Sequence, residues 1–274
     1  TITTAMLLLK GETEYPIFLD KKEKIKVQGN ANNLDHLNIE GNIYNEEFSA
    51  FQATLQGPGI PSEKMLKAEE FIRQHNNSFV SIYLLDKYFV QKETPDFKKI
   101  KELIDVMAGV LQDKPSIGQL TENITQIEKV NEGKTAPFFS LPNQKGEKVT
   151  RLDKFKDKYM LINFWASWCE ECDSTNVELR KINNKYKKNK EFGILGISLD
   201  INKEDWKNKI KQDTLTWEQV CTFTGWNLET AKQYAILKLP TNILVSPGGR
   251  ILARDIPTDS LNHAIEKVLK KEKK

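Results

Sequence analysis

Two cysteines three positions apart are the residues of this sequence best suited to do chemistry. Cys169 and Cys172 follow a run of bulky apolar residues, 159–162, which is typical of a strand buried on both faces. After them, apolar side chains recur at 3.6-residue spacing and predict an amphipathic helix. Because residues i and i+3 are neighbours on a helix, the two sulfurs can close a small disulfide. The pattern therefore predicts a redox-active dithiol where a buried strand meets a helix.

The two cysteines are expected to play different roles. Cys169 would lie at the helix N-terminus, where unpaired N–H groups and the helix dipole stabilise a thiolate. Cys172 lies one turn further along and is expected to be more buried and less ionised. We therefore predict that Cys169 is the nucleophile and that Cys172 resolves the mixed disulfide.

The remaining cysteine and the histidines do not suggest a metal site. Cys221 is in a predicted short strand, 217–221, and is expected to be buried and inert rather than a second redox thiol. One close pair plus a single cysteine is not a structural disulfide framework, and a closed zinc site needs four ligands. The three histidines have no metal-like spacing. We expect neither a metal nor a cofactor.

Three segments resemble the TlpA/ResA family of bacterial thioredoxin-like thiol–disulfide oxidoreductases. They occur in the family's order and are APFFSLP at 136–142, LINFWASWC at 161–169 and LPT at 239–241. The resemblance extends from about residue 135 to the end of the chain. It implies a thioredoxin-like fold, exchange with protein thiols and disulfides, and a membrane-bound thiol donor. Reduction of apocytochrome c cysteines during cytochrome c maturation is the substrate role it suggests, although other envelope proteins fit as well.

The resemblance also assigns residues around the dithiol. Leu239 and Pro240 match the family's cis-proline loop, which contributes to substrate recognition; the alternative is an ordinary trans proline at the start of a strand. Trp168 would flank the exposed sulfur and contact substrate, whereas Trp165 would pack beneath the site. The cis bond at Pro240 and the positions of Trp168 and Trp165 are thus expectations for the structure.

Several positions depart from the wider thioredoxin pattern. Asn163 replaces a buried aspartate, so another group or water must accept the proton of the resolving thiol. Glu171 stands where proline usually precedes the second cysteine. A proline common in the first turns of the helix is replaced by Val177.

Glu170 and Glu171, between the cysteines, are expected to tune the dithiol. Near a helix N-terminus carboxylates favour the helix, but beside a forming thiolate they repel it and raise its pKa. Destabilising the reduced form lowers the reduction potential. This favours a reductant or isomerase partner over a strong oxidant; alternatively, both carboxylates are solvated and change little.

The patterns divide the chain into two predicted domains. With 274 residues it is long enough for both. Residues 1–132 are expected to form strands to about residue 45 and then helices to about 131. Residues 133–274 are expected to form an α/β, thioredoxin-like domain, a mixed sheet flanked by helices, in which two buried strands pair in parallel.

Local signals predict further details. We expect a polar loop at 30–38 with a possible further strand at 37–41, and a strand at 138–141. We also expect an N-cap at Thr94 that opens a helix carrying apolar residues as far as Leu111. Asn202 and Asn227 are expected to cap two more helices.

Composition constrains the remaining possibilities. The chain is 39% hydrophobic and 29% charged with a net charge of +3, a balance that argues against a nucleic-acid surface. The apolar run 5–9 is too short for a membrane span or a signal-peptide core. Either no targeting sequence exists or the sequence is a mature or trimmed form. The resemblance favours the second, in the periplasm or cell envelope, with any membrane anchor on a segment absent from this sequence.

Two other function classes are open. A thiol peroxidase needs threonine or serine three residues before the reactive cysteine and proline four further back, but the chain has Ala166 and Ile162. A non-catalytic binding protein would use the helical region to recruit a partner and keep a residual dithiol.

Overall fold

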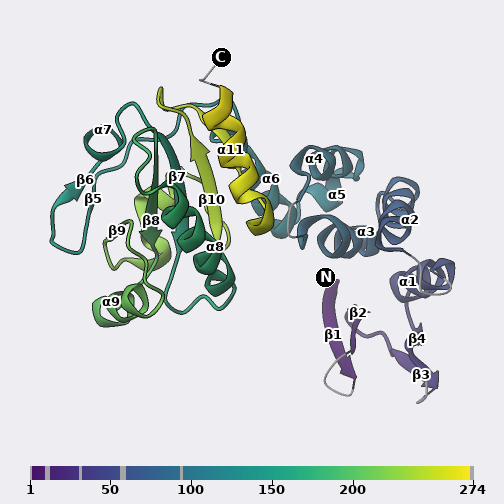
Figure 1. Ribbon diagram of the computed structural model, residues 1–274. Coiled ribbons are helices and arrows are strands. Elements are labelled where there is room, and N and C mark those ends of the chain that lie inside the picture. Colours follow the sequence, from purple (N-terminus) through teal and green to yellow (C-terminus); the bar gives the residue numbers. More distant parts are fainter. Residues whose placement is uncertain (1, 10–12, 31–32, 56–59, 93–94, 272–274) are drawn as a thin grey trace. The chain divides into compact units, whose positions relative to one another are not determined.

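A computed structural model describes residues 2–9, 13–30, 33–55, 60–92 and 95–271 (Figure 1). The chain forms two compact units, Thr1–Glu122 and Asn123–Lys274, and each is described by itself. Helix α6 (Pro115–Lys129) crosses this division. The domain boundary expected at 132/133 stays a prediction.

The first unit begins with two antiparallel hairpins. Strand β1 (Thr3–Leu9) pairs with β2 (Thr13–Leu19), and β3 (Lys26–Asn30) pairs with β4 (Asn33–Glu40). Tyr15 and Phe18 of β2 are buried, and their rings contact Phe48 of the following helix. The β1–β2 hairpin is thus held against this helix by an aromatic core.

The polar loop expected at 30–38 is wrong for residues 33–36, whereas the further strand expected at 37–41 is confirmed for residues 37–40. These residues belong to β4, in which Leu37 pairs with Gly29 and Ile39 pairs with Val27. Leu37 and Ile39 are buried. Alternating burial along β4 therefore outweighs its polar composition. Residues 31–32 lie outside the described residues.

The rest of the first unit is helical. Its elements are α1 (Ile43–Thr54), α2 (Pro61–Gln74), α3 (Phe79–Leu85), a π-helical turn η1 (Asp86–Val90), α4 (Phe97–Val106), α5 (Gly109–Gln112) and the start of α6. Phe48, Phe51 and Phe71 are buried, as expected for an aromatic core rather than a ligand groove.

The helix expected to run to Leu111 is interrupted. Helix α4 ends at Val106, and Met107 and Ala108 take extended backbone conformations before α5. The Ala108 N–H donates to the carbonyl of Asn76, so this break is fixed by a bond to another segment. The expected cap Thr94 lies outside the described residues; the observed N-cap is Asp96, which accepts from the Lys99 N–H.

A five-stranded mixed sheet forms the centre of the second unit. Its order is β11 (Ile251–Arg254), β10 (Thr241–Val245), β7 (Tyr159–Trp165), β8 (Phe192–Ser198) and β9 (Glu218–Cys221). Strands β7, β8 and β9 are parallel, and β10 is antiparallel to β7 and β11. Helices α7 (Arg151–Lys154), α8 (Glu171–Tyr186), α9 (Lys203–Gln212), α10 (Glu229–Gln233) and α11 (Leu261–Lys271) accompany it. The expected α/β class is confirmed.

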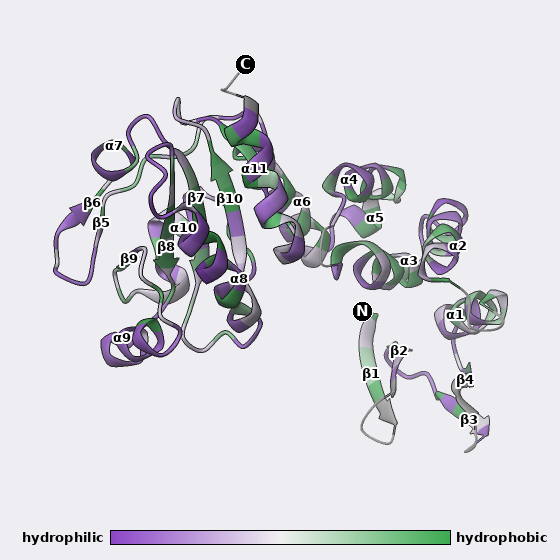
Figure 2. Ribbon diagram, viewed as in Figure 1, coloured by the Kyte–Doolittle hydropathy of each residue, from purple (hydrophilic) through white to green (hydrophobic). Residues whose placement is uncertain are grey.

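Hydropathy accounts for this arrangement. All seven residues of β7 are buried, as the apolar run predicts for a central strand. In Figure 2, α11 carries both green and purple residues, as an amphipathic helix does. Its apolar side includes Leu261 and Ile265, both fully buried.

The sheet gathers several loops at one edge. Because β7, β8 and β9 are parallel, the loops after Trp165, Ser198 and Cys221 leave from the same edge. Strand β10 begins there, since Thr241 pairs with Phe164. Helix α8 then runs back along the sheet, and its Tyr186 ring lies 5.4 Å from Phe192 at the start of β8.

Two smaller expectations are wrong. The strand expected at 138–141 is limited to β5 (Leu141–Pro142), which pairs with β6 (Lys148–Val149). Asn227 does not cap a helix: it ends a 3-10 turn, η2 (Gly225–Asn227), and Leu228 precedes α10 without a side-chain cap. Asn202, by contrast, caps α9 as expected.

Candidate active site

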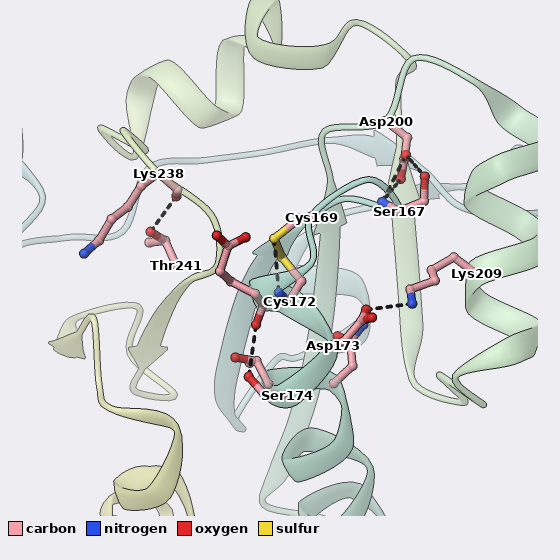
Figure 3. Close-up of a disulfide and its surroundings, with 12 residues drawn as sticks. Ser167, Cys169, Cys172, Asp173, Ser174, Asp200, Lys209, Lys238 and Thr241 are labelled. Carbon is pink, nitrogen blue, oxygen red and sulfur yellow. Dashed lines mark hydrogen bonds and ion pairs between the residues drawn. A yellow bond between two sulfur atoms is a disulfide. The ribbon is translucent and has the colours of Figure 1, made fainter. Parts of the chain in front are cut away.

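Cys169 and Cys172 form a disulfide at the start of α8. The S–S distance is 2.05 Å and the Cα atoms are 5.3 Å apart. Figure 3 shows this bond between the loop that follows β7 and the first turn of α8. Cys169 is 4% exposed and Cys172 is fully buried. Cys169 is therefore the more accessible of the two sulfurs.

A backbone N–H of the helix N-terminus points at Cys169. Helix α8 begins at Glu171, with Glu170 as its N-cap, so Cys169 lies immediately before the helix. The N–H of Cys172 donates to Cys169 Sγ at 3.2 Å. The same donor and the helix dipole would stabilise a thiolate at Cys169 once the disulfide is reduced.

The loop between β7 and Cys169 is held by a buried carboxylate. Asp200 follows β8 and is 1% exposed. Its two carboxylate oxygens each lie 3.1 Å from the Ser167 N–H nitrogen, and Ser167 Oγ donates to Oδ1 at 2.5 Å (Figure 3). Ser198 Oγ donates to Oδ2 at 2.6 Å. Sequence reasoning missed Asp200; the available signal was an acidic residue directly after a buried parallel strand.

An ion-pair network joins α8 to α9 beside the dithiol. Lys209 Nζ lies 2.6 Å from Asp173 and 3.4 Å from Asp213. Burial works to lower the pKa of Lys209, but the hydrogen bond to Asp173 and the charge of Asp213 together raise it above its usual value. Asn176 of α8 also donates to Asp213. These contacts thus hold the first turns of α8 against α9.

The Leu239–Pro240 peptide bond is cis, as predicted. It immediately precedes β10, at the sheet edge from which the dithiol loop leaves β7. Thr241 Oγ1 donates to the carbonyl of Lys238 at 2.9 Å and closes the loop across the proline. Figure 3 shows these two residues in the same close-up as the disulfide.

A buried arginine holds the segment that leads to Pro240. Arg254 is paired with Asp255 at 3.0 Å, and its guanidinium donates to the carbonyls of Tyr234 and Ala235. Tyr234 Oη donates to the Pro137 carbonyl at 2.7 Å, and burial raises the pKa of this phenol. The end of α10, which leads to the cis-proline loop, is therefore fixed from β11.

Exposed apolar side chains lie in the dithiol loop and in the loops that follow β8 and β9. Trp168 is 52% exposed, and its ring centroid lies 6.4 Å from that of Trp226, which is 46% exposed. Gly225 packs against Ile201, since a Cβ there would lie 2.9 Å from Ile201 Cγ2. Trp168, Ile201 and Trp226 thus follow three neighbouring parallel strands. Trp165 is fully buried, as expected for a packing residue.

A row of amides crosses the sheet at Asn163. In register, Asn163 pairs with Gly196, and Gly196 pairs with Gln219. The Gln219 side chain lies over Gly196 and accepts from the Trp165 indole at 3.0 Å. Asn163 Oδ1 is buried and has no hydrogen-bond partner.

Cys221 is free and buried, as expected. Its Sγ donates to the Asp200 carbonyl at 3.6 Å and accepts from the Phe223 N–H at 3.3 Å. Burial raises the pKa of this thiol. The raised pKa and the burial make Cys221 a poor nucleophile.

The other charged and metal-ligating side chains of the described residues form no second centre. Glu170 and Glu171 are exposed beside the cysteines. Within the described ranges, no group of three or more His, Cys, Asp or Glu side chains could hold a metal ion. None of the helices in those ranges is both long and apolar enough to cross a bilayer.

Comparison with known proteins agrees with the geometry. Residues 133–254 match the AhpC/TSA family. The thiol–disulfide oxidoreductase ResA of Bacillus thuringiensis subsp. konkukian is 34% identical over 149 residues, which cover 54% of this chain and 82% of that protein. The chain belongs to the ResA family of thiol–disulfide oxidoreductases. The ResA protein of Bacillus subtilis strain 168 is 28% identical over 151 residues, covering 52% of this chain and 78% of that protein.

Solved structures place the ResA-family part of the chain in the thioredoxin-like fold. A C-terminal domain from Bacteroides thetaiotaomicron, assigned as a thiol–disulfide oxidoreductase, is 56% identical with a TM-score of 0.51. The match covers 52% of this chain and 99% of that domain. This ResA-family chain is thus an enzyme of the thiol–disulfide oxidoreductase class.

Proposed function

We propose that this protein reduces protein disulfides in the bacterial cell envelope, with Cys169 as nucleophile and Cys172 as resolving thiol. One observation carries this proposal: the more accessible sulfur, Cys169, accepts a hydrogen bond from the N-terminus of α8 beside the cis-proline loop. Such a position favours the thiolate that attacks.

The exchange proceeds in two balanced steps. The Cys169 thiolate attacks a substrate disulfide, which breaks as one substrate sulfur leaves and takes up a proton. A mixed disulfide then joins Cys169 to the other substrate sulfur. Cys172, after losing its proton, attacks Cys169 and releases the second substrate sulfur. Two electrons pass to the substrate, whose two sulfurs take up one proton lost by Cys172 and one from solvent, and Cys169 and Cys172 end as the disulfide.

Trp168, Leu239 and Pro240 are proposed to bind the substrate segment around its cysteine. Trp168 is half-exposed next to Cys169, and Leu239 and Pro240 are partly exposed at the same sheet edge. Proline has no N–H and fixes the backbone. An extended substrate segment would pair with the backbone beside Pro240 while Trp168 covers the mixed disulfide.

Glu170 and Glu171 support the direction of electron flow. Both are exposed and adjoin the cysteines, so they repel a thiolate at Cys169 and disfavour the reduced form. Asn163 is uncharged, where thioredoxins have an aspartate. A dithiol that is easily oxidised is a reductant.

Envelope location, a membrane-bound thiol donor and a role in cytochrome c maturation complete the proposal. Each turnover oxidises the dithiol, so a second thiol donor must restore it. The relatives named ResA support the exchange chemistry, and the proposed substrates are envelope proteins with oxidised cysteines, apocytochrome c among them.

A trapping experiment tests the proposal. Cys172→Ser lacks the resolving thiol and should accumulate a mixed disulfide at Cys169 with disulfide-containing envelope proteins. Cys169→Ser is the matched control and should trap none. Equal trapping by the two variants would refute the assigned roles.

Equilibration with a glutathione or dithiothreitol couple tests the direction. We expect a potential well below the ~−120 mV of a strong oxidant. A potential near that value would contradict a reductant role and leave the exchange chemistry standing.

The match to the AhpC/TSA family makes thiol peroxidase the second candidate. Ala166, three residues before Cys169, is buried and carries no hydroxyl to orient a peroxide. We expect no peroxide consumption above that of Cys169→Ser. Rapid consumption that depends on Cys169 would favour the peroxidase.

A further inference from the structure

We propose that Asp200 is a positioning residue that holds the dithiol loop in its reactive geometry, above all in the reduced protein. This inference rests on the proposed function only for its effect on exchange rates. The carboxylate lies at the carboxyl end of β8, at the edge where the dithiol loop leaves the neighbouring strand β7.

The contacts of Asp200 converge on one residue of that loop. Ser167 donates both its backbone N–H and its hydroxyl to the carboxylate. Two donors from one residue fix its orientation as well as its position. Ser167 precedes Trp168 and Cys169 directly, so the orientation of Ser167 sets where those side chains point.

The carboxylate is itself firmly placed. Ser198 Oγ donates to its Oδ2, while the Asp200 N–H donates back to Ser198 Oγ at 2.9 Å. The Leu199 N–H donates to the Trp165 carbonyl at 2.8 Å and extends the β7–β8 pairing up to the loop. Asp200 thus connects the dithiol loop by hydrogen bonds to the end of β8.

Stability alone is a weak reason for this arrangement. None of the ion pairs formed among the described residues includes Asp200, although the residue is only 1% exposed. A buried carboxylate without a cation contributes less to stability than an apolar contact of similar size. Its directional hydrogen bonds instead supply a defined loop geometry.

Asp200 matters more for the position of Cys169 in the reduced protein than in the oxidised protein. In the oxidised protein the disulfide ties Cys169 to α8. When that bond is reduced, the tie is lost, but the bonds from Ser167 to Asp200 involve no sulfur and persist. A turn bond from the Cys169 N–H to the Ala166 carbonyl, at 3.2 Å, also remains. Asp200 therefore keeps Cys169 close to Cys172 in the dithiol state and favours disulfide closure.

The reduction potential of the Cys169–Cys172 couple tests this inference in the full-length chain. Asp200→Asn and Ser167→Ala each weaken the anchor and should free the reduced loop. We expect each to lower the equilibrium constant for disulfide formation three- to tenfold, which for tenfold is about 30 mV towards a higher potential. The double variant should shift little further, because both changes break the same contact.

Asp153→Asn is the matched control, since Asp153 also accepts a hydrogen bond from a hydroxyl, Thr150 Oγ1 at 2.6 Å, but lies in α7, which precedes the start of β7 and not the dithiol loop. Its potential should equal that of the wild type. Thermal unfolding of the oxidised variants is measured in parallel; Ser167→Ala, which removes one hydroxyl, keeps the test available if Asp200→Asn unfolds.

Unchanged reduction potentials in Asp200→Asn and Ser167→Ala, with or without a loss of stability, would overturn the inference. Asp200 would then have only a structural role. The potential is measurable whatever the physiological substrate. If the wild type fails to reduce protein disulfides but the variants shift the potential, the proposed function fails and the positioning role stands.

Discussion

Glu170 and Glu171 carry the charge closest in sequence to both sulfurs, and their effect is open to direct measurement. Glu170→Gln together with Glu171→Gln should raise the reduction potential by about 10–20 mV, because a surface charge here is worth roughly 0.5–1 kcal/mol and 30 mV corresponds to about 1.4 kcal/mol. The pKa of the Cys169 thiol should fall. The control Asp205→Asn removes an exposed carboxylate from the first turn of α9. An unchanged potential would mean that the two carboxylates are merely solvated.

Trp168 and Trp226 offer a second test at single residues. Trp226→Ala should raise KM for a protein disulfide about three- to tenfold and leave the rate with a small disulfide unchanged. The reason is that only a protein substrate is large enough to contact Trp226 as well as the reacting sulfur. Trp168→Ala should do the same or more. Leu152→Ala, which removes another half-exposed apolar side chain from α7, is the control. Equal losses with small and large substrates would contradict a binding role.

Single residues also show where prediction from sequence succeeds. The Cys169–Cys172 pair and the cis Leu239–Pro240 bond were both predictable, because each depends on a short local motif. Trp226 was not predictable, and the only local signal for Asp200 was an acidic residue after a buried strand. Each lies in a loop after a different strand, and only the pairing of β7, β8 and β9 brings these loops beside the cysteines.

Among the elements, β8 depends on a glycine that faces a side chain of β9. A Cβ on Gly196 would lie 1.9 Å from Gln219 Oε1. Gly196→Ala should therefore displace Gln219 from the Trp165 indole and destabilise the protein by about 1–3 kcal/mol in chemical denaturation. Gly248→Ala is the control, since a Cβ there meets only Ser246 Oγ at 4.0 Å. Equal stability of the two variants would show that Gln219 can move without cost.

Elements were predicted best where hydrophobic periodicity was strong. The buried run of β7 and the apolar faces of α6 and α8 are examples. The prediction failed at residues 33–36 of β4, where pairing with β3 overrides polar composition, and at Met107–Ala108, where a backbone bond to Asn76 ends a helix that the apolar pattern continues. Such tertiary contacts have no local signature in the sequence.

At the scale of the whole molecule, buried tyrosines predict a loss of stability in alkali. Burial raises the pKa of Tyr83 to about 12 and also raises that of Tyr234. Above pH ~10 the unfolded chain ionises these phenols while the folded chain keeps them neutral, so stability present below pH ~10 is lost as pH rises. In the oxidised protein, Tyr234→Phe should reduce the slope of unfolding free energy against pH by up to ~1.4 kcal/mol per pH unit. An unchanged slope would contradict the assigned burial effect.

The predicted domain division is also testable. We expect residues 133–274 to fold alone and keep the potential of the full chain, since the matched Bacteroides thetaiotaomicron structure is an isolated C-terminal domain. Arg254 also donates to the Val130 carbonyl, so residues 123–274 serve as the comparison. Folding of only the longer fragment would move the boundary into α6.

Counting free thiols before and after one turnover bears most directly on the exchange chemistry at Cys169 and Cys172. Reduced protein, which has three cysteines, is mixed with an excess of insulin, denatured, alkylated and weighed by mass spectrometry. We predict that the number of alkylated cysteines falls from three to one, that the remaining one is Cys221, and that each protein molecule delivers two electrons to insulin. Retention of all three thiols, or electron transfer that persists in Cys169→Ser, would contradict this chemistry.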